Sequence, residues 1–238
     1  MISEISEDSW IKKRVLMKNN WIYLSHPLNH DAPAYGGGHG FTEQNDKQMD
    51  QGDSCNTSTW AMSNHTGTHL DFPRHFSAKG KTLDDYDPDF FIFTRVFIAD
   101  LSTAEPGLIV TPDHLDLALV PNNTELLLIK TGFGQYRGQD MYSKQNPGFH
   151  PDLADYLRDT MPDLRVLGFD SISLSSFANR DLGRKAHRAF LDHDKPILPL
   201  EDMELGEINS STNIETVIIA PLRVSTADGA PCTVMAKI

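Results

Sequence analysis

The sequence predicts an α/β fold, a single domain built on a mixed β-sheet. Short apolar, β-branched segments alternate along the chain with segments that carry helix signals. The 238 residues are enough chain for one self-supporting core, and 39% of them are hydrophobic. Neither a sequence repeat nor a long Pro/Gly/Ser-rich linker divides the chain. We therefore expect one domain over residues 1–238.

Two N-terminal segments lack a clear helix or strand pattern. We expect residues 1–20, whose beginning is acidic, to form an N-terminal extension. Residues 31–54 are rich in Gly, Asn, Gln and Asp and include Gly36-Gly37-Gly38. Long segments of this composition are typical of binding lids or of disordered chain. We expect a long loop here and leave both alternatives open.

The expected strands and helices follow from hydrophobic patterns. Helix signals are a Thr followed by Pro in residues 111–115, apolar residues at helical spacing in 151–157, and the run KAHRAFL in 185–191. The expected strands are the β-branched apolar runs of residues 95–100, 125–130, 165–169 and 216–224.

The charge balance excludes some classes of partner. The formal net charge is −12, which would repel nucleic-acid phosphates and anionic lipid headgroups, so we expect neither nucleic acid nor a membrane as partner. The two cysteines, Cys55 and Cys232, are too few for a disulfide scaffold. An apolar run of the ~18 residues that a membrane span needs does not occur in the sequence. We expect a cytoplasmic protein that acts on a small molecule.

The most informative segment is NHTGTHLDFPRHF, residues 64–76, which concentrates three of the 10 histidines. In an extended segment, His65, Gly67, His69 and Asp71 project to the same side. Two imidazoles and a carboxylate can then converge, and the glycine leaves space for an ion. Gly67 and Pro73 disfavour a helix, so we expect a strand or a tight loop.

A set of two histidines and one carboxylate leaves coordination positions open, as a catalytic metal requires. Zn²⁺ or Mn²⁺ would suit these ligands, and a metal can lower the pKa of water to roughly 7. His75, beyond Pro73, would suit a general acid and base. The alternative is that these histidines are partly buried and satisfy one another and the backbone.

Other candidate residues carry weaker signals. His187 and Glu201 gain interest only beside the first cluster, since helices often carry His and Glu on their surfaces. Trp21, Tyr35 and Trp60 could wall an aromatic substrate pocket, or they could be ordinary core or surface aromatics.

Residues 65–76 resemble the signature H-x-G-T-H-x-D-x-P-x-H-F of the metal-dependent cyclase/formamidase family. This family includes bacterial kynurenine formamidases (arylformamidases), isatin hydrolases and cyclases. The similarity extends over most of the chain, through residues 24–28, 168–173, 186–188, 221–223 and 228–231.

The resemblance implies a swivelling β/β/α-type fold and a centre of one or two zinc or manganese ions. It further implies that His65, His69 and Asp71 are metal ligands and that His75 is the catalytic acid and base. His187 and Glu201 would complete the site, with Asp71 bridging two ions. The resemblance also implies a homodimer or a homotetramer.

Three features depart from the family pattern. Two more residues than usual separate His187 from Glu201, and we place them in the loop of residues 192–195. Tyr23 replaces an acidic residue, and Cys232-Thr233 stands where an arginine is common.

Three functions are compatible with the sequence. The leading hypothesis is a metal-dependent hydrolase that opens the C–N bond of an aryl formamide or a cyclic amide. A metal-dependent lyase or cyclase acting through a stabilised enolate needs the same groups. A protein that binds a metal or a small ligand without turnover is the third possibility.

Overall fold

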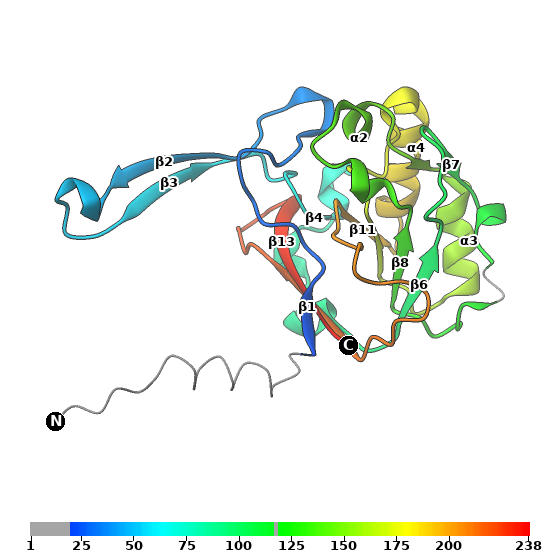
Figure 1. Ribbon diagram of the computed structural model, residues 1–238. Helices are drawn as coiled ribbons and strands as arrows, with labels where there is room; N and C mark the ends of the chain where they lie inside the picture. Colours follow the sequence, from blue (N-terminus) through cyan, green and yellow to red (C-terminus); the bar gives the residue numbers. More distant parts are fainter. Residues whose placement is uncertain (1–19, 117–118) are drawn as a thin grey trace.

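A computed structural model describes residues 20–116 and 119–238. Except for Asn20, the expected N-terminal extension lies outside the described residues. Within them, one mixed nine-stranded sheet runs through the molecule in the order β5-β12-β13-β4-β11-β10-β8-β6, with β1 paired to β13 (Figure 1). The α/β fold with a mixed sheet is confirmed.

The first half of the sheet is parallel. It contains the expected strands β6 (Val96–Asp100), β8 (Leu126–Lys130) and β10 (Val166–Phe169), followed by β11 (Leu198–Glu201). Strand β8 reads as an almost continuous apolar run because both faces of the sheet are covered here.

The second half is antiparallel. Strand β4 (His69–Asp71) joins the two halves, because it pairs with β11 on one side and with β13 (Gly229–Lys237) on the other. Strand β13 also pairs with β1 (Trp21–Tyr23) and β12 (Thr216–Pro221), and β12 pairs with β5 (Ile92–Phe93). We expected β12 to reach residue 224, but the chain turns at Thr226, with φ 60°, to enter β13.

Helices α3 (Asp152–Thr160) and α4 (Arg180–Leu191) cover one face of the parallel half, and α2 (Asp140–Lys144) lies near them (Figure 1). The expected helix at residues 111–115 is only one 3-10 turn, and β7 (Ile109–Val110) pairs with β9 (Gly148–Phe149) beside it. The 3-10 helices whose bounds lie within the described residues are Tyr35–Gly37, Met49–Gln51, Pro73–His75, Leu83–Asp85, Pro88–Phe91, Pro112–His114, Phe133–Tyr136 and Phe177–Asn179.

Alternating side chains of the parallel strands enter two different cores. Leu126 and Leu128 face the core enclosed by the two halves of the sheet, whereas Leu127 and Ile129 face the core under α3 and α4. Because each core contributes contacts to the same strands, the strand ends that carry the polar residues described below have little freedom to move.

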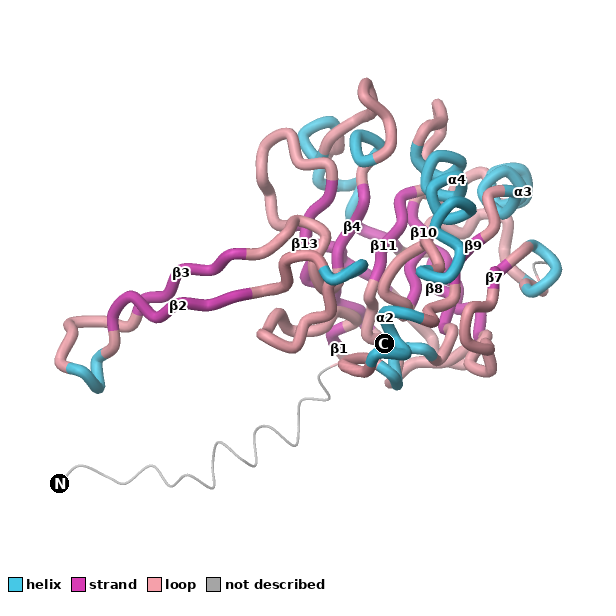
Figure 2. The backbone as a smooth tube through the Cα atoms, turned by 90° about the horizontal axis from the view of Figure 1, so that it is seen from above, coloured by secondary structure: helices cyan, strands magenta, loops and turns pink. Residues whose placement is uncertain are grey.

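A two-stranded arm extends from the body of the protein (Figures 1 and 2). Strand β2 (Thr42–Lys47) pairs antiparallel with β3 (Thr57–Ala61), and all six residues of β2 are exposed. Part of the segment 31–54, which we expected to be a loop, is therefore a strand. The sequence did not indicate this strand because it has no apolar face. Its pairing with β3 depends on hydrogen bonds between the two strands.

Within the described ranges, we find no helix with the length and apolar character that crossing a bilayer requires.

Candidate metal centre

Two neighbouring strands present the central residues of the site. His69 and Asp71 lie on the same face of β4, while Leu70 between them points into the core. Glu201, the last residue of β11, is the direct cross-strand partner of His69. The pleat and the register of two strands therefore place an imidazole and two carboxylates together.

His65 reaches the same place through a turn and not along an extended strand. Strand β4 begins only at His69, and Gly67 has φ +68°, a left-handed conformation that favours glycine. A Cβ atom at Gly67 would also lie 2.7 Å from Cδ2 of Leu28. The turn brings Nδ1 of His65 to 2.8 Å from Oδ1 of Asp71. The expected convergence is therefore present, although the alternation that predicted it holds only for residues 69–71.

The ring of His69 is fixed by a backbone carbonyl. Its Nδ1 lies 2.8 Å from the carbonyl oxygen of Gly67, and since a carbonyl only accepts, Nδ1–H donates. Its Nε2 then faces Oδ1 of Asp71 at 3.5 Å and Oε2 of Glu201 at 3.4 Å. In the neutral ring, a nitrogen lone pair is thus directed at two carboxylate oxygens.

His187 repeats this arrangement from helix α4. Its Nδ1 lies 3.0 Å from the carbonyl oxygen of Gly183, one helical turn earlier. Its Nε2 lies 3.6 Å from Oδ2 of Asp71 and 3.5 Å from Oε1 of Glu201. Burial disfavours the charged ring, but the contacts with Glu201 and Asp71 outweigh it and raise the pKa of His187.

This donor set fits a divalent cation. Lone pairs of imidazoles directed at carboxylate oxygens repel each other unless a proton or a cation lies between them, and the backbone bonds that orient the rings are typical of metal-ligating histidines. Three groups of three have ligand atoms within 4.8 Å of one another. Two of them share Asp71: His65, His69 and Asp71 form one, and Asp71, His187 and Glu201 the other. The third group is His65, His75 and Asp228 at the edge of the cluster.

The electrostatics of the site centre on the buried Asp71. Burial alone would raise the pKa of the Asp71 carboxyl, but hydrogen bonding and charge interaction with His65 hold it well below its usual range. Burial would correspondingly lower the pKa of His65, yet its contacts with Asp71 and Asp228 raise that pKa to about 9. His65 and Asp71 therefore carry opposite charges at neutral pH, with the proton of His65 in the place that a cation could take.

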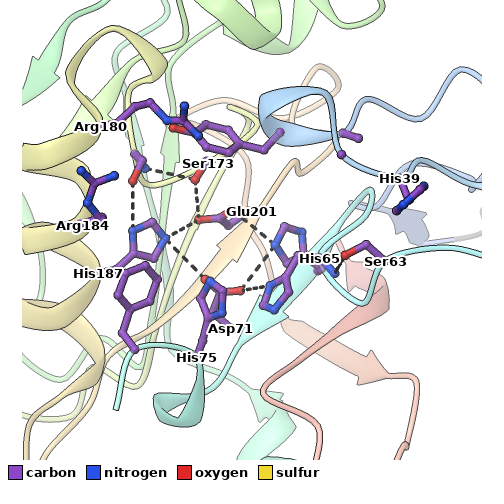
Figure 3. A pocket seen from close by; sticks show the side chains of 16 residues that line it. His39, Ser63, His65, Asp71, His75, Ser173, Arg180, Arg184, His187 and Glu201 are labelled. Carbon is purple, nitrogen blue, oxygen red and sulfur yellow. Dashed lines mark hydrogen bonds and ion pairs between the residues drawn. The ribbon is translucent and has the colours of Figure 1, made fainter. Parts of the chain in front are cut away.

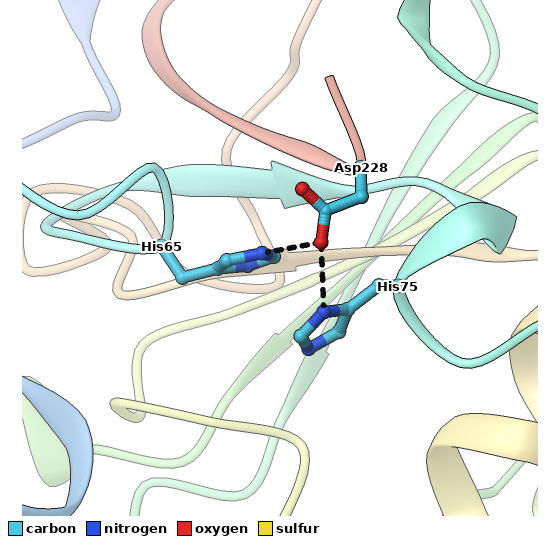
Figure 4. Close-up of side chains that lie close together, drawn as sticks. All are labelled: His65, His75 and Asp228. Carbon is cyan, nitrogen blue, oxygen red and sulfur yellow. Dashed lines mark hydrogen bonds and ion pairs between the residues drawn. The ribbon is translucent and has the colours of Figure 1, made fainter. Parts of the chain in front are cut away.

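Asp228 connects two histidines at the edge of the cluster (Figure 4). Its Oδ2 lies 3.3 Å from Nδ1 of His75 and 3.3 Å from Nε2 of His65. Asn64 donates a hydrogen bond of 2.7 Å to the other oxygen of Asp228. Burial lowers the pKa of His75. Sequence reasoning gave Asp228 no role, because 163 residues separate it from His65 and only the fold brings them together.

The cluster forms the floor of a pocket of about 320 Å³ (Figure 3). Of the three candidate aromatics, Tyr35 lines this pocket, whereas Trp60 is exposed on the arm and Trp21 lies on β1. Sequence reasoning assigned no role in the pocket to several other lining residues: His39, Ser63, Phe76, Ser173, Ser175, Arg180 and Arg184.

A second polar network lies directly behind Glu201. The next residue, Asp202, is 1% exposed and has φ 53°, an unusual conformation for a residue other than glycine. Arg137 donates to both of its carboxylate oxygens, with Nη2 to Oδ2 at 2.8 Å, and the Tyr142 hydroxyl donates to Oδ1. The network fixes the backbone at the point where Glu201 enters the site.

The fold and this convergence of histidines and carboxylates define an α/β protein with a candidate site for a divalent metal. The chain belongs to the cyclase family, because the family described as "Putative cyclase" matches residues 22–176, which include the whole His65–His75 segment.

Similar proteins are known for nearly the full length. The chain is 28% identical to the kynurenine formamidase of Bacillus cereus over 213 residues, covering 90% of this chain and 95% of the relative. It is 28% identical over 215 residues to the kynurenine formamidase of Geobacillus thermodenitrificans, covering 90% and 96%.

Solved structures show the same fold. Isatin hydrolase A from Labrenzia aggregata, bound to benzyl benzoate, superposes with a TM-score of 0.77 at 22% identity, covering 95% of this chain and 98% of that one. A predicted metal-dependent hydrolase from Bacillus stearothermophilus gives a TM-score of 0.67 at 19% identity, covering 91% and 97%.

The shared position of Asp71 predicts the effect of removing its charge. We expect Asp71→Asn to lose bound zinc or manganese, since both groups of candidate ligands depend on this carboxylate. The measurement is elemental analysis of metal per chain after incubation with either ion. The control is Asp113→Asn, an exposed aspartate away from the pocket. Equal metal content in wild type and Asp71→Asn would contradict the assignment.

The network behind Glu201 predicts a stability effect. We expect Arg137→Met to lower the free energy of unfolding by about 3 kcal/mol, because it leaves the buried Asp202 carboxylate without its cation. The control is Lys144→Met, which breaks an exposed ion pair with Asp140 and should cost less than about 1 kcal/mol. Denaturant unfolding measures both, and equal midpoints for the two variants would show that the network contributes nothing.

Proposed function

We propose that this protein is a metal-dependent hydrolase that cleaves the C–N bond of an aryl formamide or a cyclic amide. The observation that carries the proposal is the pair of ligand groups that share Asp71 at the floor of a pocket, with the additional imidazole of His75 beside them. The names of the relatives, kynurenine formamidase and isatin hydrolase, support this reaction class.

We assign His65, His69 and Asp71 to one ion, and Asp71, His187 and Glu201 to a second. Nitrogen and carboxylate donors suit both zinc and manganese, and the sharing of Asp71 favours two ions over one. When bound, such ions polarise a carbonyl group and lower the pKa of water.

His75 is positioned to move the proton in this reaction. Burial lowers its pKa, so the neutral, basic ring predominates at neutral pH. Nδ1 faces Asp228, which leaves Nε2 of the ring to take a proton from the attacking water and return it to the leaving nitrogen. Asp228 would hold the ring in the required tautomer and stabilise it once it is protonated. The ring of His75 also stacks on His65, with centroids 4.0 Å apart.

The role of His75 predicts a loss of turnover without a loss of metal. We expect His75→Ala to lower kcat for formanilide by roughly 10²–10⁴-fold, the usual contribution of a general acid and base. Metal per chain should stay at the wild-type value. The control is His193→Ala, an exposed histidine outside the pocket. Full turnover in His75→Ala would overturn the assignment.

The same assay separates hydrolysis from lyase or cyclase chemistry. In ¹⁸O-labelled water, hydrolysis places one label in the acid product, since the water oxygen forms the new C–O bond. A product without label would favour the lyase or cyclase.

We also propose that the chain is a homodimer or homotetramer held together by the arm of strands β2 and β3. A two-stranded hairpin is only marginally stable in water without packing partners. On this arm, Met49 and Trp60 are 60% and 65% exposed. A mainly apolar groove of about 850 Å³ opens at the base of the arm, lined in part by Tyr23, Phe41 and Leu222. These surfaces would be covered by a second copy.

The arm predicts a change in oligomeric state. We expect replacement of residues 44–59 by an Asn-Gly turn to convert the oligomer to a monomer of about the chain mass, 26.6 kDa, less the deleted segment. Size-exclusion chromatography with light scattering measures the mass, and unchanged metal content shows that the body remains folded. A monomeric wild-type chain, or an unchanged oligomer after the deletion, would refute the proposal.

A further inference from the structure

One face of the His187 imidazole is covered by an aromatic side chain. The ring of Phe76 stacks on it, with centroids 4.5 Å apart and an interplanar angle of 18°. Aromatic pairs attract each other at centroid distances of about 4.5–7 Å, so these two rings are in close contact. The contact joins helix α4 to the chain segment that follows β4.

The 3-10 turn Pro73–His75 and the residue after it direct two consecutive rings at the candidate ligands. His75 stacks on His65, with centroids 4.0 Å apart, and Phe76 stacks on His187. The rings of His75 and Phe76 are nearly perpendicular to each other, at 86°. One short turn therefore covers one histidine in each of the two ligand groups that share a carboxylate.

The turn that carries Phe76 is itself fixed. The backbone N–H of Phe76 donates to the carbonyl oxygen of Pro73 at 3.2 Å, and that of Arg74 donates to the carbonyl oxygen of Lys81 at 3.0 Å. A Cβ atom at Gly80 would lie 2.4 Å from the carbonyl carbon of Pro73, so the two chain segments are in direct contact. The side chain of Phe76 also packs against the core enclosed by the two halves of the sheet. The phenyl ring is therefore a rigid surface.

Hydrogen bonding alone does not fix the ring of His187. Its Nδ1 lies 3.0 Å from the carbonyl oxygen of Gly183 and 3.2 Å from Oγ of Ser175. Hydrogen bonds tolerate angular deviations of about 30°, and the torsion that rotates a histidine ring has broad minima. Such a rotation would move Nε2, on the far edge of the ring, away from Asp71 and Glu201. The stacked phenyl ring opposes the rotation, because the two rings would collide.

The candidate ligand group leaves little room for such a rotation. Nε2 of His187 lies 3.6 Å from Oδ2 of Asp71 and 3.5 Å from Oε1 of Glu201. Zinc takes nitrogen and carboxylate ligands at about 2.0–2.2 Å. A small displacement of Nε2 would therefore remove one of the three ligands of this group.

We propose that Phe76 is a positioning residue of the metal centre. Its ring holds the imidazole of His187 in the orientation that directs Nε2 at the two carboxylates, and Phe76 itself binds no ion. A hydrocarbon ring suits this task, because it offers a flat surface without competing for the ion. This inference rests on the proposed function, in which Asp71, His187 and Glu201 hold one ion.

A double-mutant cycle on metal affinity tests the proposal. Mn²⁺ is titrated into the metal-free protein, and binding is measured by calorimetry. We expect Phe76→Leu to weaken the binding step that His187→Ala also weakens, by about 10–100-fold, the usual cost of removing a group that orients a metal ligand. In the His187→Ala background, Phe76→Leu should change the affinity by less than about twofold, because no imidazole is left to orient.

Two further variants separate orientation from packing. Phe91→Leu removes the ring of another partly buried phenylalanine that packs against the same core but does not line the pocket. Its affinity for Mn²⁺ should equal that of the wild type. Phe76→Tyr keeps a flat aromatic ring and should also bind Mn²⁺ as the wild type does.

A second readout needs no metal. Protons above the face of a phenyl ring are shielded by its ring current, so the ring protons of His187 should resonate upfield in the ¹H–¹³C NMR spectrum of the metal-free protein. Their signals are identified by their loss in His187→Ala. Phe76→Leu should move them downfield, whereas Phe91→Leu should leave them in place.

The outcomes distinguish this inference from the proposed function. Wild-type affinity for Mn²⁺ in Phe76→Leu would overturn the positioning role while the hydrolase stands. An equal loss of affinity in the wild-type and His187→Ala backgrounds, or in Phe91→Leu, would also overturn it, because Phe76 would then not act through His187. If the wild type binds no metal, the proposed function fails, and unchanged His187 signals in Phe76→Leu would refute the positioning role as well.

Discussion

The buried negative charge of Asp71 is the constraint on which the site depends. A carboxylate that is 1% exposed is costly to bury unless positive groups compensate it. Around it the fold places His65, His69 and His187, and it places a second carboxylate, Glu201, within the same space. Two acids cannot share that space without cations, so the protein either holds protons on its imidazoles or binds metal. Metal binding should therefore stabilise the folded arrangement of these histidines and carboxylates.

The sheet makes this arrangement possible through the position of β4. This strand joins the parallel and antiparallel halves, so its side chains meet residues from both. Glu201 comes from β11 on the parallel side, and Gly229 from β13 lies opposite Asp71. A side chain at Gly229 would collide with the ring of His65, at 2.2 Å from its Cε1 atom. The site therefore requires a carboxylate at the end of β11, Glu201, and a residue without a side chain at the start of β13, Gly229.

The sequence predicted what local chemistry determines. The apolar runs of the strands and the cluster of histidines in residues 64–76 are patterns among neighbouring residues, so they can be recognised in the sequence. The structure brings all six candidate residues of the centre together. The sequence alone could not reveal contacts between residues that are distant along the chain. Asp228, for example, contacts His75 although 153 positions separate them. The strand from residue 42 to 47 was also hidden, because an exposed hairpin lacks the apolar alternation on which strand prediction relies.

Helix α4 links the two ends of the pocket. Its last pocket residue, His187, is fixed by the carbonyl of Gly183, and Gly183 has no side chain because a Cβ atom there would lie 2.1 Å from Oγ of Ser175. The helix therefore packs closely and sets a fixed spacing between the floor and Arg180 at its first turn. The same helix thus carries one residue of the candidate metal centre and one at the far end of the pocket.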